Sequence, residues 1–520
     1  MNEKPVRNIV ILGGGSAGWL TAGLIATEHS SNGSEGLKVT LIESPDVPSI
    51  GVGEGTWPSM RGTLQKIGIR ETDLFRECDA AFKQGAKFAK WVTGAEDDYY
   101  YHPLVLPHGF YDADLGSSWL ARGDGESFAD AVCCQSHLCE QGLAPKQIST
   151  PEYASVANYA YHLDAAKLGK LLQQHCTKKL GVHHVLDHAT EVCSTADGDI
   201  RALKTRAHGD IEGDLFVDCS GMASRLLGQH FEIPFVDKKS VLFNDAAIAA
   251  HLPYVDDRAP IASHTISTAH EAGWIWDIGL PTRKGIGIVY ASDFMDGDRA
   301  QQCLQQYASQ SVGEEMAATL SYRKIAIRPG HREIFWHRNC VAIGLSAGFL
   351  EPLEASALVL VESSAAMLAD DMPANRHVMD KVAKRFNIRL DYYWETIIEF
   401  LKLHYVLSKR TDSPYWDAHR SPETASDNLN ESLALWQTRV PNKYDFPLSE
   451  EMFPAASWQY VLYGMGFVTE LPANALREDK LEKAQHLMGE ARTYTKQYTS
   501  MLPSNRELID KILQYGMQRV

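Results

Sequence analysis

A glycine-rich turn near the N-terminus constrains this chain more than any other feature. The segment 13–18 reads Gly-Gly-Gly-Ser-Ala-Gly and lies between an apolar run at 8–12 and an apolar stretch at 19–25. A strand, a glycine turn and a helix start in this order expose backbone N–H groups where a pyrophosphate binds. The turn therefore predicts a dinucleotide site for FAD or NAD(P). The expected contact residues are Gly13, Gly15, Ser16, Ala17 and Gly18.

Two acidic residues at expected strand ends extend this pattern. The apolar run 37–42 ends at Glu43, whose carboxylate can accept a hydrogen bond from a ribose hydroxyl. A solvated strand end is the simpler alternative for Glu43. The segment 214–222 runs from an apolar strand into a turn of small residues that carries Asp218. Flavin monooxygenase-like folds place such a turn beside the ribityl chain and phosphates, so we predict FAD rather than NAD(P).

Length, charge and cysteine content narrow the class of protein. With 520 residues, 44% of them apolar, the chain exceeds one compact domain, and two closely packed modules are expected. The net charge of −16 argues against nucleic acid or an anionic membrane as a partner. The nine cysteines show no zinc spacing, which favours free thiols and no metal site. No signal peptide or membrane-spanning stretch is evident, so a cytoplasmic protein is expected.

The pattern of expected secondary structure changes near residue 373. Before it, strand-like and helix-like segments alternate, which predicts an α/β fold with a mixed sheet. The expected strands are 8–12, 39–42, 182–186, 215–218, 286–291 and 340–343, with a helix at 163–179. Beyond it, 374–407, 458–462, 480–501 and 506–515 are expected to be helical, with a Pro-rich link at 414–422. We therefore predict an FAD-binding module at 1–375 and a mostly helical substrate-side module at 376–520.

Several further motifs are informative in combination. They are GVGEGTWP at 51–58, AFKQG at 81–85, GWIWDIG at 273–279, GFLEPLE at 348–354, KLHY at 402–405, Arg410 and SPYW at 413–416. In this order they resemble the flavin-dependent tryptophan halogenase family over essentially the whole chain. The resemblance implies an FAD-binding, flavin monooxygenase-like fold and a halogenating activity.

The resemblance also implies roles for individual residues. Lys83 and Glu354 match the family's catalytic lysine and glutamate. The simpler alternatives are a solvated surface lysine for Lys83 and a cap of the following helix for Glu354. A desolvated amine can hold or react with electrophilic chlorine, and a carboxylate facing the ring can remove its proton. The implied flavin contacts are Val52, Gly53, Leu345 and Leu353. The implied halide ligands are the backbone N–H groups of Ser356 and Ala357.

Departures from the family pattern raise questions about the substrate and the halide. Gly279 replaces a proline, which predicts a more mobile wall near the flavin. Ala355-Ser356-Ala357 replaces a common Ser-Thr-Gly, which weakens the expected halide turn. His102 matches a substrate-flanking histidine, but Leu104 replaces its aromatic partner. Near 458–464, the paired tyrosines and glutamate that grip the amino acid's ammonium and carboxylate in free-tryptophan halogenases cannot be placed. Trp458 is expected either to contact the substrate or to be a core aromatic.

The resulting hypothesis is an enzyme that halogenates an electron-rich, indole-type ring with FADH2, O2 and chloride or bromide through hypohalous acid. No second nucleotide fingerprint appears, so a separate NAD(P)H-dependent flavin reductase is the expected partner, and a homodimer is possible. Two alternatives stay open. One is an aromatic hydroxylase that uses the same reduced flavin and O2, and the other is a catalytically idle FAD-binding protein.

Overall fold

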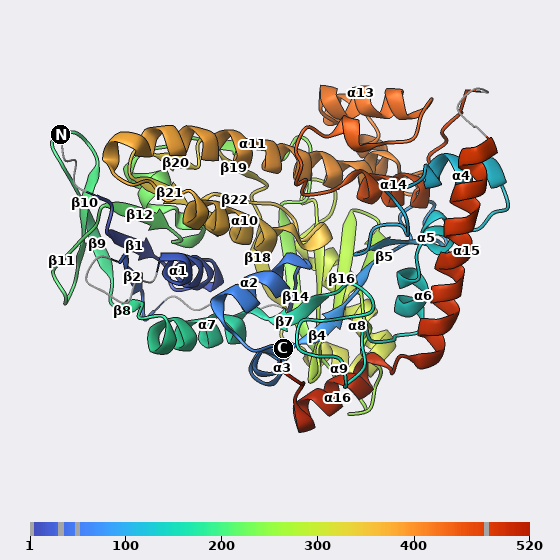
Figure 1. Cartoon of the computed structure of the whole chain (residues 1–520), viewed down its shortest axis with the longest axis horizontal. Coiled ribbons are helices and arrows are strands. Elements are labelled where there is room, and N and C mark those ends of the chain that lie inside the picture. Colours follow the sequence, from blue (N-terminus) through green and yellow to red (C-terminus); the bar gives the residue numbers. More distant parts are fainter. Residues whose placement is uncertain (1–4, 30–35, 47–52, 473–477, 520) are drawn as a thin grey trace.

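The computed structural model of the chain describes residues 5–29, 36–46, 53–472 and 478–519. Mixed sheets occupy the first two thirds of the chain and helices dominate the remainder (Figure 1). The predicted α/β class with a helical C-terminal region is therefore confirmed. Within the described residues, no helix combines the length and the apolar character needed to cross a bilayer.

A six-stranded sheet carries the glycine turn. Among the described residues its order is β20-β21-β12-β1-β2-β8, and β1 pairs in parallel with β2 and β12. Its strands are β1 (Asn8–Leu12), β2 (Lys38–Glu43), β8 (His183–Leu186), β12 (Leu215–Asp218), β20 (Trp336–His337) and β21 (Cys340–Ala342). The carboxyl ends of β1, β2 and β12 meet at one edge, where ligands bind in sheets of this kind.

A second sheet has seven strands, with the order β18-β14-β17-β16-β15-β5-β6 in the described chain. Its strands are β5 (Gly85–Ala89), β6 (Tyr99–Pro103), β14 (Ala246–Pro253), β15 (Thr265–His270), β16 (Gly273–Gly279), β17 (Arg283–Tyr290) and β18 (Arg323–Ala326). The small sheet β3-β7-β4 comprises β3 (Gly53–Gly55), β4 (Ala81–Lys83) and β7 (Ala160–Asp164). The remaining described strands are β9 (Ala189–Ser194), β10 (Ile200–Thr205), β11 (Asp210–Glu212), β13 (Phe235–Asp237), β19 (Gly330–Arg332) and β22 (Gly348–Phe349).

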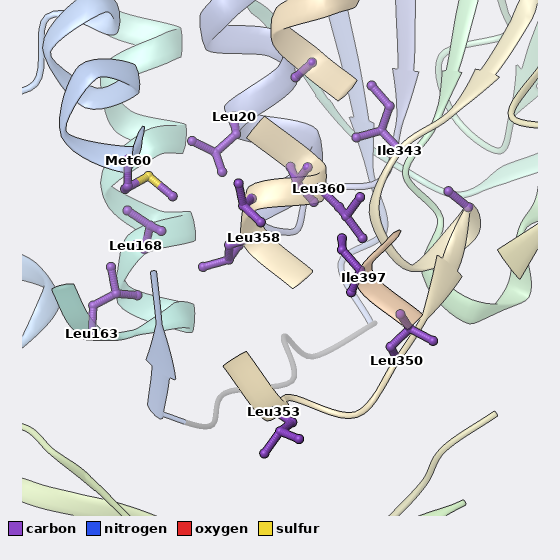
Figure 2. Close-up of a cluster of buried hydrophobic side chains, with 14 of the residues drawn as sticks. Leu20, Met60, Leu163, Leu168, Ile343, Leu350, Leu353, Leu358, Leu360 and Ile397 are labelled. Atoms are coloured by element: carbon purple, nitrogen blue, oxygen red, sulfur yellow. The ribbon is translucent and has the colours of Figure 1, made fainter. Parts of the chain in front are cut away.

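Four helices pack around the glycine turn and close the core beside it. They are α1 (Ser16–His29), α2 (Ser59–Ile67), α7 (Ala165–Lys179) and α10 (Ser356–Asp370). Figure 2 shows Leu20 of α1, Met60 of α2 and Leu168 of α7 gathered with Leu358 and Leu360 of α10, and all five side chains are buried. Each such side chain contributes roughly 1.5–3 kcal/mol of burial free energy, which fixes α10 against the nucleotide-binding edge.

The other helices cover the sheets and the substrate side. Those before residue 375 are α3 (Glu71–Cys78), α4 (Leu115–Arg122), α5 (Phe128–Val132), α6 (Gln135–Glu140), α8 (Gly297–Val312) and α9 (Glu314–Thr319). Those after it are α11 (Arg376–Val406), α12 (Pro414–His419), α13 (Asp427–Trp436), α14 (Ala455–Gly464), α15 (Glu478–Met501) and α16 (Asn505–Tyr515). Figure 1 shows α15 running along one edge of the molecule and α16 returning beneath the sheets near α3.

Two local predictions are corrected by capping interactions. The helix expected at 163–179 begins two residues later, because the Asp164 carboxylate ends β7 and accepts from the N–H groups of Ala166 and Lys167, both at 3.1 Å. The Pro-rich link at 414–422 contains α12, since the Ser413 hydroxyl accepts from the N–H of Tyr415 at 3.2 Å and Pro414 fits the first helical position.

The expected boundary at residue 375 coincides with the start of α11. The Asn375 side chain accepts from the N–H of Val378 at 3.2 Å and caps this helix. One apolar core nevertheless runs through both segments. At the far end of the chain, the Asn505 amide donates to the carbonyl of Phe82 at 3.3 Å, beside Lys83. The two predicted modules therefore share their interior.

Candidate active site

The glycine turn is shaped to bring backbone close to a ligand. Gly13 has φ +122°, and a Cβ placed on it would lie 2.1 Å from the carbonyl oxygen of Cys219. A Cβ on Gly18 would lie 1.9 Å from the Gly13 oxygen, whereas one on Gly15 would meet no atom within 4 Å. The first turn of α1, which starts at Ser16, contains no acidic residue. The packed inner side and the open outer side fit a pyrophosphate held by N–H groups.

The two acidic strand ends behave differently. The Glu43 carboxyl group lies directly against Gly14, where a Gly14 Cβ would come within 2.2 Å of Cδ, and its Oε2 is 2.9 Å from Nε2 of His184. Asp218 is fully buried and organises its own turn. Its carboxylate accepts from the N–H groups of Leu226 and Leu227 at 2.8 and 2.9 Å, besides two bonds from Ser220. Glu43 thus borders the glycine turn at 13–18, which we call the glycine cradle. A flavin contact by Asp218 stays a prediction.

The other expected flavin contacts lie near this edge or outside the described chain. Leu345 is half-buried in the short helical turn Gly344–Ser346, where a Cβ on Gly344 would come within 2.8 Å of Cβ of Ala17. Gly53 is buried at the start of β3, and Leu353 is buried beneath the turn that precedes α10 (Figure 2). Val52 lies outside the described residues.

Lys83 is a buried cation at the end of β4, with 2% of its surface exposed. Its Nζ donates to the carbonyl of Thr56 at 3.2 Å. A Cβ on Gly55 would lie 3.3 Å from both Lys83 Nζ and the Cβ of Ala355, so β3, β4 and the turn before α10 meet at this amine. Burial lowers the pKa of Lys83 to about 8, although the charge of Glu354 opposes the shift. The alternative of a solvated surface lysine is wrong.

Glu354 lies on a strained turn. Glu354 has φ +65° and Ala355 has φ +56°, two consecutive left-handed residues without a glycine. Such a conformation costs roughly 1–2 kcal/mol per residue, so contacts elsewhere must hold it. One of them is the Trp57 indole N–H, which donates to the Glu354 carbonyl at 2.7 Å.

Two histidines bind the Glu354 side chain from opposite elements. Nδ1 of His102, on β6, lies 2.8 Å from Oε1, and Nε2 of His404, on α11, lies 3.4 Å from the same oxygen. Burial alone raises the pKa of Glu354, but the two rings hold it below its usual range. The carboxylate is thus ionised at neutral pH beside the Lys83 ammonium. Glu354 precedes α10 without capping it, so the helix-cap alternative is wrong.

The predicted halide ligands open the 15-residue helix α10. Ser356 is buried at its first position and Ala357 is exposed at its second. N–H groups in the first turn of a helix have no partner within the helix, and the helix dipole adds partial positive charge there. An anion bound at this end would lie next to the Glu354 turn.

Aromatic rings lie around His102. Phe400 and Phe453 stack with centroids 3.7 Å apart, and the His102 ring lies 5.6 and 6.3 Å from them and 6.2 Å from Tyr460. Trp458 is 2% exposed and packs edge-on against the Phe400 ring at 5.0 Å. The core-aromatic interpretation fits its position, and a substrate contact by Trp458 stays a prediction.

The family model for tryptophan halogenases matches residues 8–479 of the chain. The chain belongs to the tryptophan halogenase family. It is 50% identical to a tryptophan halogenase from Shewanella frigidimarina, with a TM-score of 0.97 over 99% of both chains. It is 32% identical to the 7-chloro-L-tryptophan 6-halogenase KtzR of Kutzneria, over 97% of this chain and 99% of that protein. The tryptophan 6-halogenase SttH of Streptomyces toxytricini has a TM-score of 0.89 and 32% identity over 97% and 99% of the two chains.

Membership of the tryptophan halogenase family confirms the predicted enzyme class, a flavin-dependent halogenase. Packing and backbone geometry explain two of the departures from the family motifs. Gly279 lies in β16, pairs with Lys284 and is so closely packed that a Cβ there would lie 3.0 Å from Ile261. The added freedom of a glycine is therefore not available at this position. The left-handed turn lies at 354–355, so the missing glycine at 357 falls inside a helix, where none is needed.

Several residues of the site were not predicted. His404 lies in the KLHY motif, from which no role for its ring was predicted. The Tyr100 hydroxyl lies 2.5 Å from Nδ1 of His404. Because a neutral imidazole has one N–H, Tyr100 donates to Nδ1 when Nε2–H faces Glu354. Burial lowers the pKa of His404, which favours this neutral form. The sequence contains no local signal for these contacts, because β6 and α11 are about 300 residues apart.

Among the described residues, no cluster of His, Cys, Asp and Glu is placed to hold a metal ion.

Proposed function

We propose that this enzyme halogenates an electron-rich ring of indole type, with chloride or bromide as the halide and hypohalous acid as the oxidant. The observation that carries the proposal is the buried Lys83 ammonium beside ionised Glu354, at the N-terminus of a helix and next to a cluster of aromatic rings. Electrophilic substitution releases one proton from the ring and consumes one at the oxidant. A buried cation and a buried anion placed side by side can supply the one proton and accept the other.

FAD is the cofactor that the glycine cradle fits. Gly13, Gly15, Ser16, Ala17 and Gly18 would hold its pyrophosphate, with Glu43 toward the ribose and Gly53, Leu345 and Leu353 toward the ring system. When bound, reduced FAD would supply two of the four electrons that reduce O2 and the halide the other two, so that reduced flavin, halide, O2 and one proton give oxidised flavin, hypohalous acid and water. The N–H groups of Ser356 and Ala357 hold the halide.

Lys83 and Glu354 divide the proton transfers of the second step. The Lys83 ammonium donates to the oxygen of hypohalous acid, which weakens the oxygen–halogen bond. As the ring carbon bonds to the halogen, that oxygen leaves as water with the Lys83 proton. The Glu354 carboxylate then accepts the proton from the same ring carbon. Return of that proton to Lys83 restores both groups, and the net reaction is hypohalous acid plus arene to halogenated arene plus water.

We propose an indole other than free tryptophan as the substrate, because no paired tyrosines and glutamate that would bind an amino acid's ammonium and carboxylate can be placed near 458–464. Leu104, where the family has an aromatic residue, is half-buried, and its N–H and carbonyl are bonded to the side chains of Gln135 and Asn158. It offers no ring for stacking, which removes about 1 kcal/mol of recognition. A separate NAD(P)H-dependent reductase supplies the reduced flavin, and a homodimer is one possible assembly.

The test is incubation of the purified protein with a flavin reductase, NADH and a panel of indoles and phenols in chloride or bromide, followed by mass spectrometry. The expected result is a halogenated product that disappears when halide is withheld. A hydroxylated product that forms without halide would establish the monooxygenase alternative. FAD binding without any product across the panel would favour the idle flavoprotein.

A further inference from the structure

The turn before α10 carries a second buried carboxylate, Glu351, three residues before Glu354. Adjacent residues of α11 reach the two carboxylates: His404 contacts Glu354, as described above, and the Tyr405 hydroxyl donates to Oε2 of Glu351 at 2.7 Å. One turn of α11 therefore contacts both glutamates of the turn at 351–357, which we call the catalytic turn. The KLHY motif thus pairs with the two glutamates of GFLEPLE.

Glu351 collects hydrogen bonds from three parts of the chain. Besides Tyr405, Oε2 accepts from the Trp274 indole N–H of β16 and from the Asn244 amide before β14, both at 2.7 Å. The side chain is 1% exposed, and Oε1 has no hydrogen-bond partner among the described residues. Burying a carboxylate is costly unless donors compensate it, and here three neutral donors converge on one oxygen. The contacts therefore tie β16, α11 and the catalytic turn to one atom.

The backbone of the catalytic turn explains why such a tie is needed. Glu354 and Ala355 adopt left-handed angles without a glycine. Trp57 bonds the Glu354 carbonyl, and His102 and His404 contact its side chain, so these contacts hold Glu354 itself but not the residues before it. Without an anchor on that N-terminal side, the turn can relax toward ordinary angles and carry the Glu354 carboxylate away from His102. A displacement of about 1 Å at a reacting group can reduce a rate about a hundredfold.

We propose that Glu351 is a positioning residue that holds the 354–355 turn in its left-handed form, so that Glu354 keeps its contact with His102 beside Lys83. This inference rests on the halogenation proposed above. Glu351 acts through its Oε2 acceptor atom, whose hydrogen bonds come from Asn244, Trp274 and Tyr405. Its effect falls on the transfer of halogen to the ring, while the flavin cradle at Gly13 stays intact.

The test compares Glu351→Leu, which removes the acceptor, with Glu351→Gln, whose amide oxygen can accept the same three bonds. The matched control is Glu362→Gln, a buried glutamate of α10 that bonds only to the Thr63 and Ser59 hydroxyls, at 2.7 and 3.3 Å. The readout is halogenated product per reduced flavin consumed. We expect about a hundredfold loss for Glu351→Leu, with flavin consumption within about twofold of wild type. We expect little change for Glu351→Gln and Glu362→Gln.

Glu351→Leu with a wild-type product ratio, or with equal losses of flavin consumption and halogenation, would overturn the proposal. If Glu351→Leu does not fold, Tyr405→Phe removes one of the three donors instead. This variant should lower the yield of product per reduced flavin severalfold, and an unchanged yield would count against the positioning role. A crystal structure separates this inference from the halogenase proposal. If wild type forms no product, a Glu351→Leu structure that keeps φ near +65° at Glu354 still refutes the positioning role.

Discussion

The glycine turn at 13–18 and the catalytic turn at 351–357 both lead into helices, but they are stabilised in different ways. Gly13 adopts φ +122°, an angle that side chains rarely allow, so the residue type itself makes the conformation accessible without strain. Glu354 and Ala355 adopt left-handed angles that their side chains disfavour. Their turn depends on contacts with Trp57, on β6 through His102 and on α11 through His404. The nucleotide turn is therefore locally determined, whereas the catalytic turn is set by residues distant in sequence.

The largest expected effect concerns the catalytic turn. Glu354→Gln should lower the halogenation rate by roughly two to four orders of magnitude, because an amide cannot accept the ring proton. Flavin consumption should persist, since the glycine cradle is untouched. Single-turnover product formation with excess reduced flavin measures the effect, with Glu362→Gln as the control for loss of a buried carboxylate on α10. A rate near that of wild type would remove Glu354 from the chemistry.

The nucleotide turn should fail differently, by losing stability. Gly13→Ala should lower the free energy of unfolding by roughly 2–4 kcal/mol, because the new Cβ meets the Cys219 oxygen and the backbone angle is strained. Gly15→Ala is the matched control, since its Cβ has open space. Its free energy of unfolding should lie within about 0.5 kcal/mol of the wild-type value, and it should bind FAD more weakly. Urea unfolding without cofactor and FAD titration provide the two readouts. Equal stability of the two variants would contradict a locally determined turn.

The third effect is a pH dependence that distinguishes the two forms of Lys83. Burial lowers the pKa of Lys83 to about 8, so the amine is mainly protonated at pH 7 and mainly neutral at pH 9. If the ammonium is the proton donor, product per reduced flavin should fall about tenfold between these values. The uncatalysed reaction of the same hypohalous acid with the substrate corrects for the acid's own titration. A ratio that rises with pH would instead identify the neutral amine as the reacting form.

The smallest effect concerns the substrate. Indole should be preferred over free tryptophan, because an ammonium and a carboxylate without partners each lose hydration in a partly apolar pocket. Competition between the two at equal halide and reduced flavin measures the preference. A preference for tryptophan of about tenfold or more, equivalent to about 1.4 kcal/mol, would mean that residues of the helical region bind both groups.

The difference between the two turns also explains which parts of the site the sequence could predict. Gly13 and Gly18 identify the cradle, because only glycine satisfies the local geometry. Lys83 and Glu354 followed from the resemblance to the halogenase family. His404, Tyr100 and Glu351 were not assigned, because their contacts form only when α11 packs on β6 and the catalytic turn. The alternation of strands and helices predicted the fold class, whereas cap positions such as Asp164 and Ser413 required the structure.

The Lys83→Ala variant tests most directly whether flavin oxidation and halogen transfer occupy separable parts of this molecule. The measurement is halogenated product and flavin consumption on the same sample, with a scavenger that reports free hypohalous acid. We predict a folded variant that consumes reduced flavin at close to the wild-type rate, releases hypohalous acid and forms no product on the enzyme. Retained halogenation of the enzyme-bound substrate would contradict a role for Lys83, and loss of flavin consumption together with product would contradict the separation of the two turns.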